Sequence, residues 1–447
     1  MEEPRKCGAF LYKLARGIFL NKLYIHPLNT GNTIMKPKRL LQSSSILIII
    51  ILLLNCKKTT ESESNWGDAD FTSFVSIGNS LTAGVADGAL YEDSQKNSFP
   101  MLIARMAEVD DDFEQPIMGG NGFSFDETDG KLQLQADFSI SFLEPGNELN
   151  WNLNRAYNNL GIPLIRAEYL YNATTSVQAD SNHFIDKILR NSGNTPIEEA
   201  LTLNPTLITL WVGSNDVLES ATLGLADNNS TYTQSNDFAI HINNIVNQLT
   251  AGTDAPIFIA NIVDITDLPY FTSLPSFVGP DNNKTYLFGN CENGVRRLTD
   301  EDLVLFWALP DYFSLKISGN ISQATALNDT LILDAQEKAT ITVVINEYNV
   351  IIQNIVNSNS QVYLVDMYSI FKNITTNGYT FDGVKYLTEI IFFDSAGALS
   401  FANTLFSIDG LHPNKVGYAS FANSFIDKIN TTLNANLPIV TDDHLEY

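Results

Sequence analysis

Two stretches that lie far apart in the chain share one pattern: a short apolar run, a glycine, small polar residues and then a helix-like segment. In the first, residues 74–77 precede Ser80, and in the second, residues 207–212 precede Asn215. Each stretch predicts a buried strand that turns sharply into a helix. Ser80 and Asn215 are then expected at the carboxyl ends of two strands.

The rest of the chain continues this alternation. Further strands are predicted over residues 257–265 and 362–366, and helices over 91–112, 237–249, 334–356 and 419–429. Strands that alternate with helices favour a parallel sheet covered on both faces, whose functional groups gather at the carboxyl ends of the strands. We therefore expect an α/β fold.

Two stretches interrupt the alternation. Residues 113–151 are rich in Gly, Asp and Asn and predict an irregular insertion. Residues 269–331 contain aromatics, prolines and glycines and predict a cap-like insertion with one helix over 299–309, where Thr299 and Asp302 form a capping pattern. Five aromatic residues of the second insertion either line an acyl pocket or belong to the core: Tyr270, Phe271, Phe277, Phe306 and Trp307.

Composition excludes several functions. The chain has 447 residues, of which 44% are hydrophobic, and a formal charge of −25. Such a charge repels nucleic acid and anionic lipid headgroups, so we expect no nucleic-acid partner. No histidine pair has metal-ligand spacing, and the sequence contains no phosphate-binding glycine motif, so we expect neither a metal nor a cofactor.

The N-terminal region has the pattern of a bacterial signal peptide over residues 35–55, with Lys36, Lys38 and Arg39 before an apolar run that is too short to span a bilayer. Residues 53–56 resemble a lipoprotein signal-peptidase site, which makes Cys56 the expected lipidation site and first mature residue. The alternative is a secreted protein with ordinary cleavage.

Around this signal, residues 1–34 are interpreted as an upstream mis-start or, alternatively, a real extension, and the polar residues 56–70 as a tether. The expected location is the bacterial cell envelope, with a lipid anchor at Cys56 in the outer membrane as the only membrane contact. The folded domain is expected over residues 71–435, followed by a tail over 436–447.

A third motif lies near the C-terminus, where Asp409 and His412 are three residues apart in a tight turn. In such a turn the carboxylate can hold the Nδ1–H of the imidazole and leave Nε2 facing outward. His412 is therefore a candidate general base. Ser80 is then either its nucleophile or simply the N-cap of a helix.

Together these residues resemble the SGNH, or GDSL-type, hydrolases, which are esterases and lipases on a three-layer α/β/α sandwich with a flavodoxin-like central parallel sheet. Three blocks carry the resemblance, in the order of the family: Gly78-Asn79-Ser80-Leu81, Gly213-x-Asn215-Asp216 and Asp409-x-x-His412. The resemblance implies that Ser80 is the nucleophile, that Asn215 donates to the oxyanion, and that Asp409 orients the base His412.

The sequence departs from the family pattern at two positions. Asn79 replaces the usual Asp, and in the glycine block of residues 159–164 the second glycine is replaced by Leu164. Because the oxyanion donor of this block is a backbone N–H, a side chain does not abolish it, although it can restrict the backbone or crowd the acyl pocket. Either Gly161 or Leu164 supplies the donor.

The expected function is hydrolysis of carboxylic esters through an acyl-enzyme on Ser80. The substrate is expected to be a small-molecule or lipid ester, and relatives of this kind act on lipid esters, aryl esters or acetylated carbohydrates. The alternative is a non-catalytic envelope lipoprotein that binds lipid on the same fold, because Asn79 and Leu164 can accompany lost activity.

Overall fold

The computed structural model describes residues 66–447, except 136–139, 227–230, 292, 391, 394–398 and 401–402. The described residues belong to one compact unit, Asn65–Tyr447. The expected extension, signal peptide and lipidation site at Cys56 lie outside the described residues.

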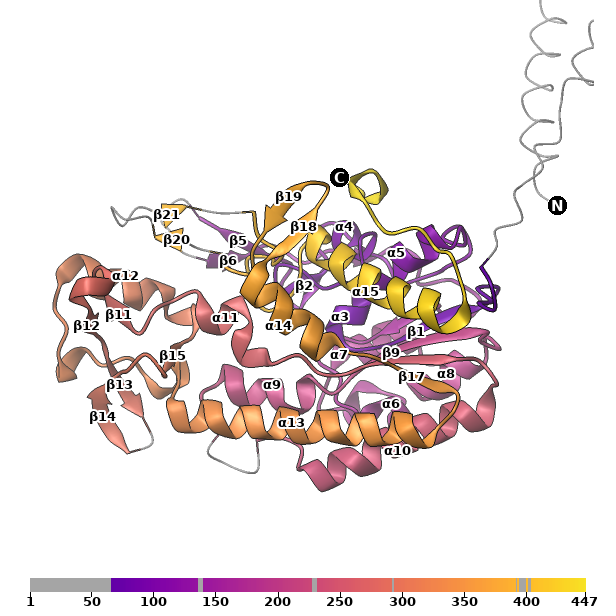
Figure 1. Ribbon diagram of the computed structural model, residues 1–447, viewed down its shortest axis with the longest axis horizontal. Helices are drawn as coiled ribbons and strands as arrows, with labels where there is room; N and C mark the ends of the chain where they lie inside the picture. The colour runs from indigo at the N-terminus through magenta and orange to yellow at the C-terminus, as the bar shows by residue number, and fades with distance from the viewer. Residues whose placement is uncertain are drawn as a thin grey trace, which may run out of the picture. The chain divides into compact units, whose positions relative to one another are not determined.

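A five-stranded sheet forms the centre of this unit (Figure 1). Its spatial order is β8 (Asn159–Gly161), β1 (Phe74–Gly78), β9 (Leu207–Trp211), β10 (Ile257–Ala260) and β17 (Val362–Val365). Neighbouring strands pair in parallel throughout. Numbered along the chain, this is the order 2-1-3-4-5 of flavodoxin-like folds, which confirms the predicted fold class.

The strands are apolar because both faces of the sheet are covered. All residues of β1, β9 and β10 are buried. The two polar residues inside these strands satisfy one another, since the hydroxyls of Ser76 and Thr209 lie 2.6 Å apart across the β1–β9 pair. Of the predicted strands, 257–265 is too long, because β10 ends at Ala260.

Helices cover the two faces of the sheet (Figure 1). One face carries α10 (Ser235–Gly252) and α13 (Ala335–Ser358), where Phe238 stacks on Tyr348. The other face carries α5 (Phe99–Met106), α14 (Met367–Asn377) and α15 (Lys415–Leu433). This is the predicted three-layer sandwich. Within the described part of the chain, no helix is both long and apolar enough to cross a membrane.

Two helix predictions have the wrong bounds for identifiable reasons. The single helix expected over 91–112 is two helices, α4 (Glu92–Gln95) and α5, because the Ser98 side chain caps α5 and Pro100 sits in its first turn. The helix expected over 419–429 begins earlier, since the side chain of Asn414 accepts the N–H groups of Val416 and Gly417.

Both insertions contain small antiparallel hairpins. In 113–151, β5 (Leu132–Leu134) pairs with β6 (Ile140–Phe142). The cap-like insertion holds β13 (Phe288–Cys291), β14 (Gly294–Arg297) and α12 (Leu309–Ser318), at the left of Figure 1.

The predicted helix over 299–309 is wrong. The carboxylate of Asp302 instead accepts the N–H and the hydroxyl of Thr299 in a turn, and β15 (Leu303–Val304) follows, paired with β16 (Ile332–Leu333).

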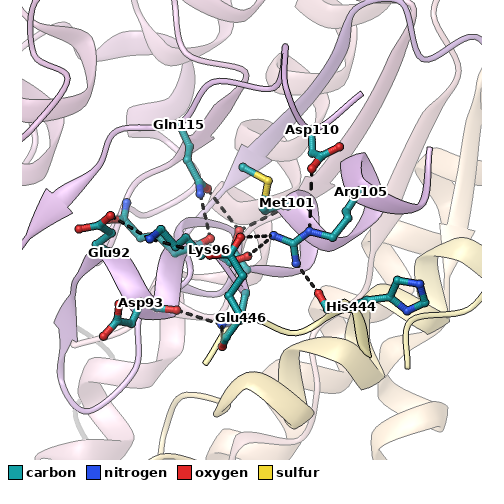
Figure 2. Close-up of polar contacts among 12 residues, drawn as sticks. Glu92, Asp93, Lys96, Met101, Arg105, Asp110, Gln115, His444 and Glu446 are labelled. Carbon is teal, nitrogen blue, oxygen red and sulfur yellow. Dashed lines mark hydrogen bonds and ion pairs between the residues drawn. The ribbon is translucent and has the colours of Figure 1, made fainter. Parts of the chain in front are cut away.

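The last residues, 436–447, contact α15 through the side chains of Asn423 and Asn430, and α5 through Arg105 (Figure 2). Arg105 donates to the backbone carbonyl of His444, and its Nη2 lies 3.0 Å from Oε1 of Glu446. Three apolar side chains of this segment are buried: Leu437, Val440 and Leu445. The segment named above as a tail is therefore an integral part of the compact unit.

Candidate active site

Ser80 is the first residue of α3 (Ser80–Ala83), directly after β1. The N-cap of this helix is Asn79, whose Oδ1 accepts the N–H of Leu81 at 3.0 Å. The interpretation of Ser80 as a cap is therefore wrong, and its hydroxyl is left for another partner. Asn and Asp cap helices about equally well, so Asn79 keeps the function of the Asp it replaces.

The hydroxyl of Ser80 begins a chain of hydrogen bonds. Its Oγ lies 2.9 Å from Nε2 of His412, and Nδ1 of His412 lies 2.8 Å from Oδ2 of Asp409. All three side chains are buried. The structure thus brings together, from opposite ends of the domain, the three residues that the sequence nominated, in the orientation expected for nucleophile, base and orienting acid.

Asp409 lies in a loop that we call the acid–base loop (residues 407–412). Its Oδ1 accepts the N–H groups of Leu411 and His412 and the hydroxyl of Ser407. Its Oδ2 accepts from His412 and from the N–H of Gly88 at 2.7 Å. Burial by itself raises the pKa of this carboxyl, but His412 and the hydrogen bonds outweigh it and hold the pKa below its ordinary value.

Gly410 gives the acid–base loop its sharp turn. Its φ is +72°, and a Cβ at this position would approach the backbone nitrogen of Tyr270 to 2.8 Å. A side chain would therefore both strain the backbone and separate the loop from α11 (Pro269–Thr272). The glycine explains how Asp409 and His412 reach one side of the turn.

Asn215 begins α9 (Asn215–Thr222) after β9. Its Nδ2 donates to the carbonyl of Ile165 at 3.0 Å, which uses one of the two N–H groups of the amide. Asn215 also lines a cavity together with Ser80 and His412. The second N–H can therefore serve an oxygen bound beside Ser80.

Ile165 belongs to what we call the oxyanion segment (residues 161–167). The next residue of α9, Asp216, also binds this segment, since its Oδ2 accepts the N–H of Ala167 at 2.9 Å. Its Oδ1 accepts the hydroxyl of Thr233. Burial raises the pKa of Asp216 from its ordinary value of 3.8 to about 6. The sequence marked Asp216 only as part of a motif, and the structure shows that it fixes this segment to α9.

The structure separates the two candidates for the backbone donor. The N–H of Gly161 already donates to Oδ1 of Asn159 at 2.9 Å, and a Cβ on Gly161 would approach the backbone nitrogen of Ala83 to 2.2 Å. Gly161 therefore permits close packing, and its N–H already has an acceptor. Among the described residues, no acceptor pairs with the N–H of Leu164 or of Ser80.

Leu164 has a φ of +62°, in the left-handed region that glycine adopts most easily. Glycine, which the family pattern described above has at this position, adopts this conformation without strain. The leucine is accommodated because its side chain points outward and is 42% exposed. Its side chain therefore does not close the site but forms part of the cavity wall.

The cavity beside Ser80 has a volume of about 470 Å³. Its apolar lining residues come from both insertions and the oxyanion segment: Phe125, Leu132, Phe142, Leu164, Tyr270 and Trp307. Its polar lining residues include Arg166, Tyr169, Asp180, Asn182, His183 and Glu219.

The sequence identified the aromatic lining only in part. Of the five aromatics proposed for an acyl pocket, Tyr270 and Trp307 line the cavity, whereas Phe271 and Phe306 are buried in the core. Phe277 is half-buried, packs against Tyr286 and does not line the cavity. Phe125 and Phe142 were missed, because their insertion was interpreted only by its Gly, Asp and Asn content. Aromatic residues in a polar stretch are the signal that could have found them.

Among the described residues, no group of three or more His, Cys, Asp or Glu side chains could hold a metal ion. The fold and the site thus define an α/β protein with a Ser–His–Asp hydrogen-bond chain at the carboxyl ends of its strands.

A family model, GDSL-like lipase/acylhydrolase, matches residues 74–425. The chain therefore belongs to this family of hydrolases. No curated protein matches it. Among solved structures it is similar to LAE5, an alpha/beta hydrolase enzyme from the metagenome of Lake Arreo, Spain, with 12% sequence identity, a TM-score of 0.35, and coverage of 81% of this chain and 96% of that chain.

Proposed function

We propose that this protein hydrolyses carboxylic esters through an acyl-enzyme on Ser80. The observation that carries the proposal is the continuous hydrogen-bond chain from Ser80 through His412 to Asp409. In the first step Nε2 of His412 takes the hydroxyl proton while Oγ attacks the ester carbonyl carbon. His412 then returns that proton to the departing alcohol, and the C–O bond to the alcohol breaks.

The tetrahedral intermediate carries a negative oxygen, for which three donors are proposed. These are the side-chain amide of Asn215 and the backbone N–H groups of Ser80 and Leu164. The absence of an acceptor for either backbone N–H within the described residues supports this role. In the second step water attacks the acyl carbon and His412 takes a proton from that water. His412 then gives the proton to Oγ of Ser80, the bond between Oγ and the acyl carbon breaks, and the acid departs.

The alternative of a non-catalytic lipid carrier rested on the two departures from the family pattern. Asn79 caps α3 as an Asp would, and Leu164 keeps the backbone N–H and the left-handed conformation of the glycine it replaces. Neither departure removes a chemical group that the mechanism needs. Catalysis is therefore the function we propose.

For the substrate, we propose an uncharged ester with an acyl chain longer than acetyl. A cavity of about 470 Å³ falls in the range that encloses ligands of drug size, and an acetyl group would leave most of it empty. Three large apolar side chains at this cavity remain substantially exposed, namely Phe142 (47%), Trp307 (45%) and Leu164 (42%). Grouped exposed apolar side chains of this kind favour an apolar ligand.

Hydrolysis of p-nitrophenyl esters from acetate to decanoate by the purified protein tests the reaction and the substrate together. We expect kcat/KM to rise with chain length, and Ser80→Ala to lower kcat on the order of 10⁶-fold. A fluorophosphonate probe should label the wild type, and His412→Ala should abolish the labelling. Equal rates for wild type and Ser80→Ala would refute the mechanism, whereas a maximum at acetate would refute only the proposed chain length.

The location remains a proposal from the sequence motif: a lipid anchor at Cys56 in the outer membrane of a bacterial envelope. Metabolic labelling with a radioactive fatty acid tests it. Label that is incorporated by the wild type and lost in Cys56→Ala supports the anchor, and an unlabelled protein in the medium indicates ordinary secretion.

A further inference from the structure

A turn on the nucleophile side of the domain holds the acid–base loop. We call residues 85–91, which follow α3, the Asp87 turn. The N–H of Ala86 donates to the carbonyl of Ala89 at 3.1 Å, and the N–H of Ala89 donates back at 3.0 Å. Asp87 and Gly88, at the centre, have φ values of +50° and +69°. Two consecutive positive φ values give a tight two-residue turn whose central N–H groups point outward.

Three hydrogen bonds join this turn to the acid–base loop. The N–H of Gly88 donates to Oδ2 of Asp409 at 2.7 Å. The N–H of Asp87 donates to the hydroxyl of Ser407 at 2.8 Å, and that hydroxyl donates to Oδ1 of Asp409 at 3.1 Å. The side chain of Asp87 completes the set, since its Oδ1 accepts the N–H of Ile408 at 3.1 Å.

The carboxylate of Asp87 is itself held in place. Its Oδ2 accepts the hydroxyl of Tyr91 at 2.7 Å, so both carboxylate oxygens have partners. The turn is further fixed by its backbone, because the carbonyl of Asp87 accepts the N–H of Leu132 at 2.8 Å. Burial raises the pKa of Asp87, and the nearby Asp409 acts in the same direction. A second carboxylate so close to Asp409 is unfavourable unless its hydrogen bonds are needed.

These contacts decide where Oδ2 of Asp409 lies. That oxygen accepts both the N–H of Gly88 and Nδ1 of His412, so any shift of the turn moves the acceptor that orients the imidazole. A displacement of about 1 Å in such a site can cost on the order of a hundredfold in rate. Asp87 does not line the catalytic cavity, and its contacts are with the loop and Tyr91.

We propose that Asp87 is a positioning residue, which fixes Asp409 and thereby the His412 imidazole through the Asp87 turn. The proposal rests on the proposed ester hydrolysis, because His412 must act as base for its orientation to matter. Asp87 joins two segments that are 321 residues apart in the chain, as the bond from Ile408 shows.

Two variants at this position separate positioning from folding. Asp87→Ala removes both acceptors, and we expect kcat for a p-nitrophenyl ester to fall on the order of tenfold to a hundredfold with KM within about twofold. Asp87→Asn keeps one oxygen for the N–H of Ile408 and offers its amide to the oxygen of Tyr91. It should therefore restore kcat to within about threefold of wild type.

The matched control is Asp93→Ala, which removes an exposed carboxylate from α4 just beyond the turn and should leave kcat unchanged. Thermal unfolding of each variant is measured in parallel. If Asp87→Ala does not fold, Tyr91→Phe decides, since it removes only the hydroxyl that orients Asp87 and should lower kcat about twofold to fivefold at unchanged KM.

The proposal is overturned if folded Asp87→Ala, or Tyr91→Phe, keeps the wild-type kcat. It is also overturned if Asp87→Asn does not restore the kcat that Asp87→Ala loses. Failure of the proposed function is distinguishable, because it would appear as a wild type that neither hydrolyses esters nor reacts with a fluorophosphonate. An active wild type with an inactive Ser80→Ala and a fully active Asp87→Ala rejects the positioning role alone.

Discussion

The acid–base loop and the oxyanion segment both contribute residues to the cavity beside Ser80, and they are built in different ways. In the acid–base loop the working groups are side chains, and Asp409 alone accepts five hydrogen bonds that fix it. In the oxyanion segment the proposed working group is the backbone N–H of Leu164, and the segment is held from outside by Asn215 and Asp216.

This difference shows at which positions a side chain can be substituted while the proposed catalytic groups stay in place. A side chain that donates, accepts or orients must be of the right type, and the D-x-x-H block of this chain is intact. A backbone N–H is present whatever the side chain, provided the backbone can adopt the required φ. Leu164 meets that condition at φ +62°. Variants in the two regions should therefore differ sharply in effect.

Among variants of these two regions, the largest effect is expected for Asp409→Asn. The amide would present N–H groups where the carboxylate now accepts from both His412 and Gly88, so the imidazole loses its orientation and its counter-charge. We expect kcat for a p-nitrophenyl ester to fall on the order of 10⁴-fold. Ser407→Ala, which removes one of the five bonds, serves as control and should lose less than tenfold. Similar losses in both variants would contradict the dominant role of the Asp409 charge.

A smaller loss is expected for Asn215→Ala, which removes a side chain that binds the oxyanion segment. Removal of one oxyanion donor typically lowers kcat on the order of a hundredfold to a thousandfold, with little change in KM. Asn182→Ala provides a comparison, because its Nδ2 donates to the carbonyl of Pro163 in the same segment without being a proposed oxyanion donor. An equal loss in the two variants would mean that Asn215 acts only by holding the segment.

Leu164→Gly should have almost no effect on the chemical step, in contrast to Asp409→Asn and Asn215→Ala. The N–H remains, so we expect kcat on p-nitrophenyl acetate within about threefold of wild type. Stability should change by no more than about 1 kcal/mol, because relief of the left-handed strain offsets the greater freedom of the unfolded chain. The control Leu223→Gly alters a side chain of equal exposure, 42%, at φ −101°, where glycine can only destabilise. A large loss of kcat in Leu164→Gly would show that the leucine side chain itself takes part.

The last prediction concerns the pH dependence of stability and Asp216, whose Oδ2 accepts the N–H of Ala167 in the oxyanion segment. Its pKa is about 6 in the folded protein and ordinarily 3.8. A raised carboxyl pKa favours folding at low pH, so this contribution is full below about pH 4 and is lost as pH rises through about 6. The stability of the wild type relative to Asp216→Asn should fall by up to about 3 kcal/mol between pH 4 and 7, measured by urea unfolding. A difference that is constant with pH would contradict the raised pKa.

The sequence alone determined the parts of this protein that depend on local patterns. Short apolar runs predicted four of the five strands of the sheet, because strands buried on both faces are predominantly apolar. The turn chemistry around Ser80 and within Asp409-x-x-His412 is also local, so its residues could be named from spacing. The short edge strand β8 carries no such run, and the sequence did not predict it as a strand.

Only the tertiary structure decided the features that depend on contacts between distant segments. It showed that Gly161 packs against α3 and that the N–H of Leu164 has no acceptor among the described residues, because hydrogen-bond partners from other segments cannot be deduced from spacing. It likewise brought Phe142 and Trp307 to one cavity from two insertions. The Asp87 turn contacts Asp409 only in the folded protein. The carboxyl ends of parallel strands lie at one edge of the sheet, and residues hundreds of positions apart in the chain therefore meet there.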